Sequence, residues 1–286
     1  MFVVFGASGN TGSIVASTLL ERGKKVRVVA RDASKVAGLA NKGAEVFQGD
    51  ALDAASVAKA LEGAEGAYFL VPPDFSSTDS LARGRKIVDA YAGALSRAAV
   101  KHAVLLSSAG ADAEGTGLIE TVHYAEPVLA KTKTPFTFVR AAYFMENLLG
   151  FAQPMKGDGV LPVFGGGESY PIPMVATRDI GRVSAEALLA PTSQTEIIEL
   201  SGPKEYSFVD AAAEASKILG RPVNATPLPI DALVPAIRAM GASEDVATLY
   251  REMTEASKSG KVRFHGTHKS VRGATALGEV LRAGLA

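Results

Sequence analysis

The sequence predicts an α/β fold in which helices cover both faces of a mostly parallel sheet. Short runs of β-branched and aromatic residues alternate with amphipathic stretches through the first half of the chain, and the strand-like runs are apolar on both faces. A Gly-rich turn follows directly after the first of these runs. With 286 residues, the chain is long enough to bury a core in one large domain or two smaller ones.

The first half of the chain supplies the predicted sheet. We expect strands at residues 2–5, 25–30, 44–48, 66–70, 102–107 and 137–140. Apolar residues recur every three or four positions between them, which predicts helices at residues 11–22, 34–41, 54–62 and 79–98. This alternation is typical of a doubly wound parallel sheet, and we assign it to a first domain over residues 1–150.

The sequence after about residue 150 is rich in Gly and Pro and then becomes helical again. It predicts a helix at residues 177–189, a strand at 196–201, and helical patterns at 208–219 and 230–258. We expect residues 151–286 to form a smaller, mostly helical domain that binds the substrate. The 196–201 strand could instead return to the main sheet.

Composition excludes several classes of function. Thirty basic residues balance thirty acidic ones, so no net field favours nucleic acid or an anionic membrane. The absence of Cys excludes disulfides, thiolate metal ligands and a thiol nucleophile, and His102, His265 and His268 show no metal-ligand spacing with carboxylates. We find neither a signal-peptide pattern nor a membrane-length apolar run, and we therefore expect a cytoplasmic protein without metal.

The Gly-rich turn is the strongest functional motif. It reads Gly6-Ala7-Ser8-Gly9-Asn10-Thr11-Gly12, between an apolar strand and an amphipathic helix. Glycines in this position allow a sharp turn and let a pyrophosphate approach the amides at the helix N-terminus. The turn therefore predicts a Rossmann-type domain that binds a dinucleotide cofactor through Gly6, Ser8, Gly9, Asn10, Thr11 and Gly12.

The end of the second strand indicates which dinucleotide the protein binds. A site for NAD usually places Asp or Glu here, but this chain has Arg31, followed by Asp32 and, one turn later, by Lys35. A guanidinium complements a 2′-phosphate, so we predict NADP, with NADPH preferred over NADH. The alternatives are that Asp32 reaches the ribose, or that these residues are only surface charges.

Other strand ends give further cofactor-binding candidates. Asp50 could lie at the edge of the adenine, Val71 and Pro72 could form a wall beside the nicotinamide ribose, and Ser107 ends the fifth strand. Ligands of open α/β sheets gather at the carboxyl ends of strands, which supports these positions. Turn chemistry alone would also place polar residues and Pro there.

The usual proton donor of short-chain reductases is missing. These enzymes place a Lys four residues after a catalytic Tyr, and none of the seven Tyr has a Lys at that offset.

Taken together, the motifs resemble the NmrA-like family of atypical short-chain dehydrogenases/reductases. That family includes quinone oxidoreductases, azoreductases and non-enzymatic redox sensors. The resemblance covers most of the chain and rests on five segments in combination: residues 3–12, 43–50, 105–108, 139–147 and 177–181. It implies a Rossmann-type fold, a nicotinamide cofactor and a small-molecule substrate.

Related enzymes carry a Lys on the helix after the fifth strand, but residues 121–128 contain none, and Pro127 predicts that this helix is interrupted or restarted. His123 and Tyr124 are the remaining candidate proton donors, and we expect at most one of them to face the cofactor because helical neighbours point about 100° apart. Both residue types are also common in packing roles. We assign the substrate to Ser108, Tyr143, Phe144 and Asn147.

The leading hypothesis is an NADPH-dependent oxidoreductase that transfers a hydride to a small apolar electrophile such as a quinone or an azo compound. The missing Lys favours a rival, a non-catalytic redox sensor that acts through a protein partner. Epimerase chemistry is less favoured because those enzymes generally keep the Tyr/Lys pair. The helix expected at 79–98 could form a homodimer surface or simply pack on the sheet.

Overall fold

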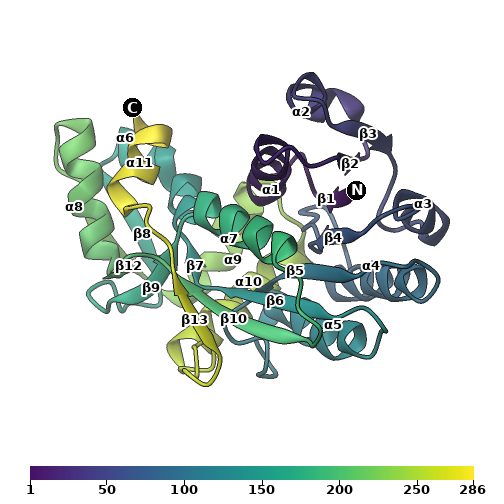
Figure 1. Cartoon of the computed structure of the whole chain (residues 1–286). Coiled ribbons are helices and arrows are strands. Elements are labelled where there is room, and N and C mark those ends of the chain that lie inside the picture. Colours follow the sequence, from purple (N-terminus) through teal and green to yellow (C-terminus); the bar gives the residue numbers. More distant parts are fainter.

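The computed structural model describes all 286 residues, and its centre is a parallel sheet of eight strands (Figure 1). From edge to edge the strands are β13 (Lys269–Arg272), β10 (Glu196–Ser201), β6 (Phe136–Ala141), β5 (His102–Ser108), β4 (Gly66–Phe69), β1 (Phe2–Phe5), β2 (Val26–Ala30) and β3 (Glu45–Gln48). All neighbouring pairs are parallel. This is a Rossmann-type order, and its direction reverses between β1 and β4, where open α/β sheets bind ligands.

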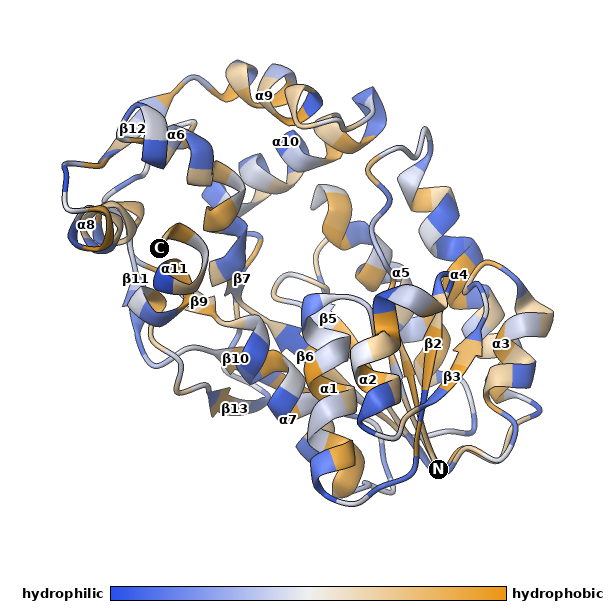
Figure 2. Cartoon of the chain, turned by 90° about the horizontal axis from the view of Figure 1, so that it is seen from above, coloured by the Kyte–Doolittle hydropathy of each residue, from blue (hydrophilic) through white to orange (hydrophobic).

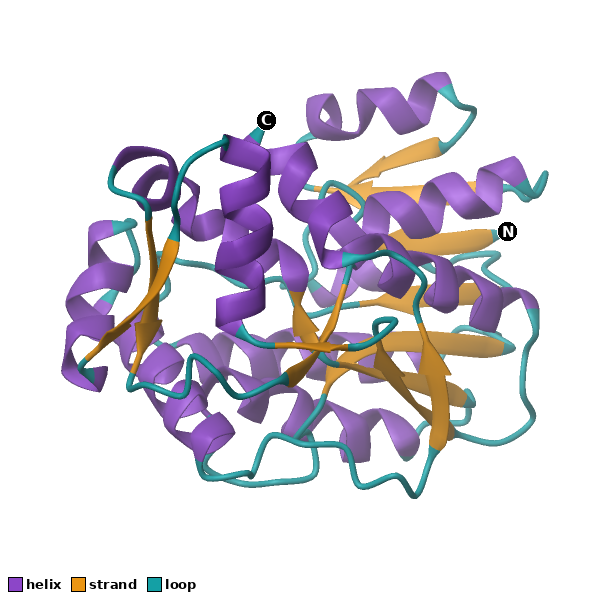
Figure 3. Ribbon diagram, turned by 90° about the vertical axis from the view of Figure 1, so that its left-hand side faces the viewer, coloured by secondary structure: helices purple, strands orange, loops and turns teal.

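Helices cover both faces of the sheet (Figure 3). One face carries α1 (Asn10–Glu21), η1 (Ala33–Val36), α2 (Ala37–Asn41) and α7 (Thr177–Leu189); the other carries α3 (Ala54–Ala60), α4 (Ser80–Leu95) and α5 (Glu120–Ala130). Strand side chains alternate between the faces, so Val4 joins a cluster of 23 buried residues and Val3 joins one of 22. Figure 2 shows the strands as mostly hydrophobic.

The remaining elements lie mainly at one end of the molecule, opposite α2 and α3 (Figure 1). They are η2 (Gly117–Ile119), β7 (Tyr143–Phe144), η3 (Met145–Phe151), α6 (Ala152–Gly157), β8 (Val160–Phe164), β9 (Ile172–Val175), β11 (Glu205–Tyr206), α8 (Phe208–Leu219), β12 (Asn224–Leu228), η4 (Ile230–Ala232), α9 (Leu233–Ala239), α10 (Glu244–Lys258) and α11 (Leu277–Leu285). Strands β7, β9 and β11 form one small sheet, and β8 pairs with β12.

Most predicted elements are present, with three differences. The 196–201 strand does return to the main sheet as β10, and β13, which the sequence pattern did not indicate, forms the edge beside it. The helical pattern at 230–258 divides into η4, α9 and α10, and a turn at Gly241, with φ 93°, separates α9 from α10. The division at residue 150 stays a prediction.

The third difference concerns Pro127. The expected interruption is wrong, because α5 continues from Glu120 to Ala130 with Pro127 inside it. The ring lies one turn before the helix ends, so only a short stretch of helix depends on the lost backbone donor. Pro127 is also exposed, and its ring therefore does not have to be accommodated in the core.

No helix in the structure combines the length and the apolar character that crossing a membrane would require.

Candidate functional site

The turn between β1 and α1 requires glycine at two positions. Gly6 has φ +66°, in the left-handed region that other residues rarely adopt. A Cβ on Gly12 would lie 2.3 Å from the carbonyl oxygen of Gly6, which no side chain could tolerate. The Gly9 amide donates to the Gly6 carbonyl at 3.0 Å and closes the turn. The helix therefore begins in direct contact with the end of the strand.

The amino end of α1 is left open. Its N-cap residue is Gly9, no side chain caps the helix, and the first turn has no acidic residue. Ser8, Gly9 and Asn10 are exposed. Thr11 is buried, and its Oγ1 accepts a hydrogen bond from the Tyr68 hydroxyl at 3.1 Å. Unpaired amides and the positive end of the helix dipole suit an anion such as a pyrophosphate.

Two neighbouring charged residues at the end of β2, Arg31 and Asp32, make different interactions. The Asp32 carboxylate caps η1, with Oδ1 accepting from the Ser34 amide at 2.9 Å and from the Ser34 hydroxyl at 2.7 Å. These bonds lower the pKa of Asp32. The Arg31 side chain is exposed and has no hydrogen bond or ion pair within the protein, and Lys35 is exposed nearby. Arg31 is therefore available to a ligand, whereas Asp32 is engaged.

The loops after β3 and β4 are held by local hydrogen bonds. Asp50 is half-buried, and its Oδ1 accepts from the Leu52 amide at 3.0 Å. After β4, Val71 and Pro72 are half-buried, and the Pro72 carbonyl accepts from Arg83 Nη1 at 2.8 Å. The β4 loop thus has a fixed course at the carboxyl edge, beside the point where the strand order reverses.

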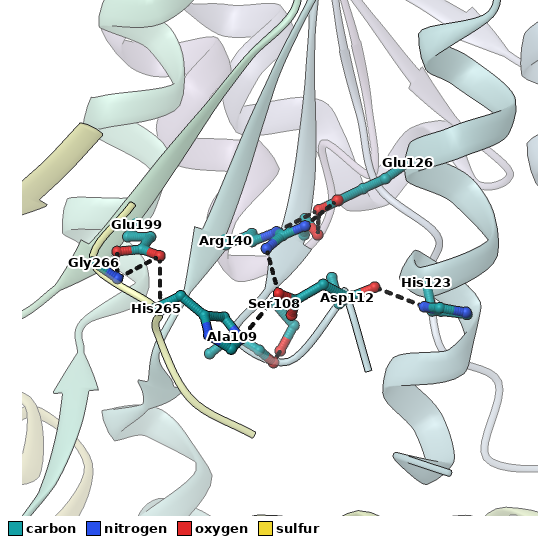
Figure 4. Close-up of polar contacts among 11 residues, drawn as sticks. Ser108, Ala109, Asp112, His123, Glu126, Arg140, Glu199, His265 and Gly266 are labelled. Carbon is teal, nitrogen blue, oxygen red and sulfur yellow. Dashed lines mark hydrogen bonds and ion pairs between the residues drawn. The ribbon is translucent and has the colours of Figure 1, made fainter. Parts of the chain in front are cut away.

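A buried ionic network lies at the carboxyl ends of β5 and β6 (Figure 4). Arg140 donates to Glu126 from Nε at 3.0 Å and from Nη2 at 2.6 Å, and the Ser107 hydroxyl donates to the same carboxylate at 2.6 Å. Arg140 also pairs with Asp112 at 3.4 Å, and Asp112 pairs with His265 Nε2 at 3.0 Å. Burial disfavours the charged guanidinium, but the hydrogen bonds and negative charges of Glu126 and Asp112 together outweigh it and raise the pKa of Arg140.

This network fixes two segments that border the carboxyl edge. Asp112 belongs to the loop after β5, and His265 belongs to the segment before β13. Glu199 of β10 accepts hydrogen bonds from the amides of His265 and Gly266 and holds that segment further (Figure 4). Removing one partner of a buried ion pair typically costs about 3–5 kcal/mol of stability. The sequence pattern did not indicate this network, and its only signal is Arg140, a charged residue in a mostly apolar strand.

The two serines at the end of β5 differ. Ser107 is buried, and its hydroxyl is engaged by Glu126. Ser108 is half-buried, and its hydroxyl donates only to the adjacent Ala109 carbonyl at 3.0 Å. Ser108 is therefore the more available of the two.

His123 and Tyr124 point to different surroundings, as expected for helical neighbours. His123 Nδ1 lies 2.9 Å from the Ala111 carbonyl in the loop after β5 (Figure 4), which means that this nitrogen carries a proton. Its Nε2 has no partner in the protein and can donate a proton only from the charged imidazole. The Tyr124 hydroxyl donates to Asp89 of α4 at 2.8 Å, and this bond raises the pKa of Tyr124. The structure thus does not bring Tyr124 together with the strand-end residues.

The three residues assigned to the substrate after β6 are placed differently. Tyr143 and Phe144 form β7 and are half-buried, whereas Asn147 is exposed in η3. Glu146, between them, accepts from the Thr177 hydroxyl at 2.7 Å and ties η3 to α7. No group of three or more His, Cys, Asp or Glu could hold a metal ion.

The arrangement offers three features to a dinucleotide along the carboxyl edge. These are an anion site at the amino end of α1, a free guanidinium after β2, and the ordered loops after β3 and β4. The polar residues after β5 and β6 lie further along the same edge. The residues present therefore fit a dinucleotide with its phosphates on α1.

The chain is similar in sequence to two reductases. The NAD(P)H azoreductase of Xenophilus azovorans is 28% identical over 258 residues, covering 88% of this chain and 86% of that protein. The (4-alkanoyl-5-oxo-2,5-dihydrofuran-3-yl)methyl phosphate reductase of Streptomyces griseus is 31% identical over 242 residues, covering 84% and 81%.

A solved structure shares the fold over nearly the whole chain. The NADPH-dependent quinone oxidoreductase of Escherichia coli, complexed with NADPH, superposes with a TM-score of 0.81 at 22% identity and covers 99% of both chains. The model of the NmrA-like family matches residues 1–272. The chain therefore belongs to the NmrA-like family, as its sequence motifs predict.

Proposed function

We propose that this protein is an NADPH-dependent oxidoreductase that reduces a small, apolar electrophile such as a quinone or an azo compound. The observation that carries the proposal is the open amino end of α1 in combination with the free guanidinium of Arg31. The names of the relatives support the class of reaction, because they include an azoreductase and a quinone oxidoreductase. When bound, the reduced nicotinamide supplies the hydride.

The proposed preference for NADPH rests on the different contacts of Arg31 and Asp32. Asp32 would have to give up two hydrogen bonds to Ser34 before it could accept from a ribose hydroxyl. The Arg31 side chain makes no hydrogen bond or ion pair in the protein, although its charge helps to lower the pKa of Asp74, and it can bind a 2′-phosphate through paired N–H groups. Lys35 adds positive charge on the same segment.

The remaining contacts follow from the positions of the loops. The amides of Ser8, Asn10 and Thr11 would hold the pyrophosphate, and Asp50 would border the adenine. Val71 and Pro72 would pack beside the nicotinamide ribose. Ser107 would act mainly by holding Glu126. The substrate would be contacted by Ser108, Tyr143, Phe144 and Asn147. His123 is the better candidate for a proton donor, since Tyr124 would first have to release Asp89.

The missing Tyr/Lys pair supports a second candidate function, a redox sensor that binds the dinucleotide and signals through a protein partner. Turnover separates the two functions. We expect the purified protein to consume NADPH when it is given quinones or azo dyes, measured by the loss of absorbance of the reduced nicotinamide. Tight NADPH binding without consumption of NADPH by any acceptor would contradict the enzyme and favour the sensor.

A further inference from the structure

The first turn of α1 carries the proposed pyrophosphate site, and only one side chain bonds it to the rest of the fold. Ser8, Gly9 and Asn10 are exposed, and no side chain caps the helix. Of residues 8–13, Thr11 alone has a side-chain hydrogen bond to another element, since the bond from Ser13 to the Asn10 carbonyl stays within the helix. Whatever holds the Thr11 side chain therefore also holds the amides beside it.

The partner of Thr11 is Tyr68, on the strand beside β1. Tyr68 lies in β4, is in register with Val4 and is completely buried. Its ring belongs to the same buried cluster as Val15 and Ala16 of α1, and its hydroxyl donates to Thr11 Oγ1 at 3.1 Å. This bond joins α1 to the sheet at the point where the strand order reverses.

The Tyr68 hydroxyl is a permanent donor in this pair. Burial raises the pKa of Tyr68, and the hydrogen bond to Thr11 lowers it by less. The phenol therefore keeps its proton across the physiological pH range, and Thr11 Oγ1 accepts it as a hydrogen bond throughout. The Thr11 side chain is thus held in one orientation.

Helix α7 contacts the same turn. A Cβ on Gly181, in α7, would lie 2.9 Å from the Thr11 carbonyl oxygen and 2.5 Å from the Cβ of Ile14. Because Gly181 has no side chain, α7 can pack directly against the backbone of α1 at this point. Thr11 is therefore bonded to β4 through its side chain and packed against α7 through its backbone.

We propose that Tyr68 is a positioning residue for the pyrophosphate site: its hydroxyl fixes Thr11, and this holds the amides of Asn10 and Thr11 in the orientation that a pyrophosphate requires. The inference rests on the function proposed above and extends it to a residue of β4 that is too deeply buried to contact the cofactor itself. Donors that are already oriented need not be ordered by the ligand, so the site binds more tightly.

A structural role and a positioning role predict different effects on ligands. A buried Tyr hydroxyl requires a partner in any fold, and a bond that serves stability alone would not distinguish one part of the cofactor from another. A bond that positions the amides of α1 acts only on ligands with a pyrophosphate. Adenosine 2′-monophosphate has the adenine, the ribose and the 2′-phosphate of NADPH without the pyrophosphate, and it therefore separates the two roles.

The test is calorimetric titration of Tyr68→Phe with NADPH and with adenosine 2′-monophosphate. The variant keeps the aromatic ring and loses only the hydroxyl. We expect its affinity for NADPH to fall about three- to tenfold, as the loss of one hydrogen bond does, and its affinity for adenosine 2′-monophosphate to stay unchanged. In the phosphorus NMR spectrum of bound NADP⁺, the pyrophosphate signals should move and the 2′-phosphate signal should not.

Two further variants identify the origin of the effect. Thr11→Val removes the acceptor, so adding Tyr68→Phe to it should weaken NADPH binding no further. Tyr206→Phe is the matched control, because Tyr206 is also buried and its hydroxyl also makes a hydrogen bond, accepting from the Leu277 amide at 3.3 Å. It lies in β11, outside the main sheet, and should leave NADPH binding unchanged.

The outcomes separate this inference from the proposed function. If the wild-type protein binds NADPH and Tyr68→Phe binds it equally well, or loses NADPH and adenosine 2′-monophosphate to the same extent, the positioning role is wrong and the proposed function stands. An equal loss of NADPH affinity in Tyr206→Phe would also contradict the positioning role. If the wild-type protein binds no NADPH, both the proposed function and this inference are wrong.

Discussion

The amino ends of α1 and α8 differ in whether side chains cap them. In α8, the Ser207 side chain accepts from the Asp210 amide, and the Asp210 carboxylate accepts from the Ser207 amide and hydroxyl. In α1, the equivalent positions hold Gly9 and Gly12, and no side chain bonds to the exposed amides.

This difference distinguishes a helix end that stabilises the fold from one that serves a ligand. A capping box satisfies two backbone donors and places negative charge at the positive end of the helix, which contributes to stability. Side chains cap α3, α4, α8 and α10. Three other helices lack both a cap and an acidic first turn, α2, α6 and α9, but each continues directly from a 3-10 helix, whereas α1 begins at the turn after β1. The open end is therefore the strongest structural support for an anionic ligand there.

The largest effect is expected from adding a side chain inside the turn between β1 and α1. Gly12→Ala places a Cβ 2.3 Å from the Gly6 carbonyl oxygen, so the turn must open and the first amides of α1 must move. We expect calorimetry to show NADPH binding weakened by about a hundredfold or more, because misplacing several hydrogen-bond donors costs more than one bond.

Gly38→Ala is the matched control. It lies in α2, where an added Cβ meets nothing within 4 Å, and it should leave binding unchanged. If the Gly12 variant keeps its affinity for NADPH and has a normal circular dichroism spectrum, the turn does not bind the cofactor.

A smaller effect is expected from giving α1 the acidic residue that it lacks. Asn10→Asp places a carboxylate in the first turn, where it should stabilise the helix by about 0.3–1 kcal/mol. The same charge should repel a pyrophosphate and weaken NADPH binding about tenfold. A higher melting temperature together with weaker binding would confirm that the open end serves a ligand at the expense of stability. Asn10→Ser provides the uncharged control, and an Asp variant that binds NADPH as tightly as this control would argue against the site.

The smallest effect is expected at α8. Ser207→Ala should cost about 1 kcal/mol of unfolding free energy and leave NADPH binding unchanged. The bonds from Ser207 lower the pKa of Asp210, so their contribution is present above the ordinary carboxyl pKa of 3.8 and is lost as the pH falls through the folded-state pKa.

The difference in stability between wild type and Ser207→Ala should therefore be full near neutral pH and shrink in acid. Urea unfolding at several pH values measures it. A difference that stays constant down to about pH 2 would exclude the Asp210 carboxylate as its source.

The sequence was most informative where local patterns determine the structure. The strands of the first half and the turn from Gly6 to Gly12 could be predicted because each depends on neighbouring residues. The edge strand β13 could not be, because only pairing with β10 makes Lys269 to Arg272 a strand. The same limit applies to the function of Asp32, which depends on how the chain folds back at Ser34.

The substrate side of the site depends on contacts between distant segments. The carboxylate of Glu126 meets Arg140 only because α5 packs beside β6, and no spacing in the sequence encodes that contact. By contrast, Arg31 could be identified from the sequence because it follows a strand directly, at the position that commonly contacts the cofactor ribose.

The most direct test of the account is calorimetric titration of the purified protein with NADPH and with NADH, repeated with Arg31→Ala. We predict that NADPH binds more tightly than NADH, and that the variant loses about tenfold or more of its affinity for NADPH while its affinity for NADH changes little. Arg97→Ala, at an exposed arginine just after the end of α4, should behave as the wild type. Equal affinities for both nucleotides that Arg31→Ala does not alter, or no binding of either, would contradict the account.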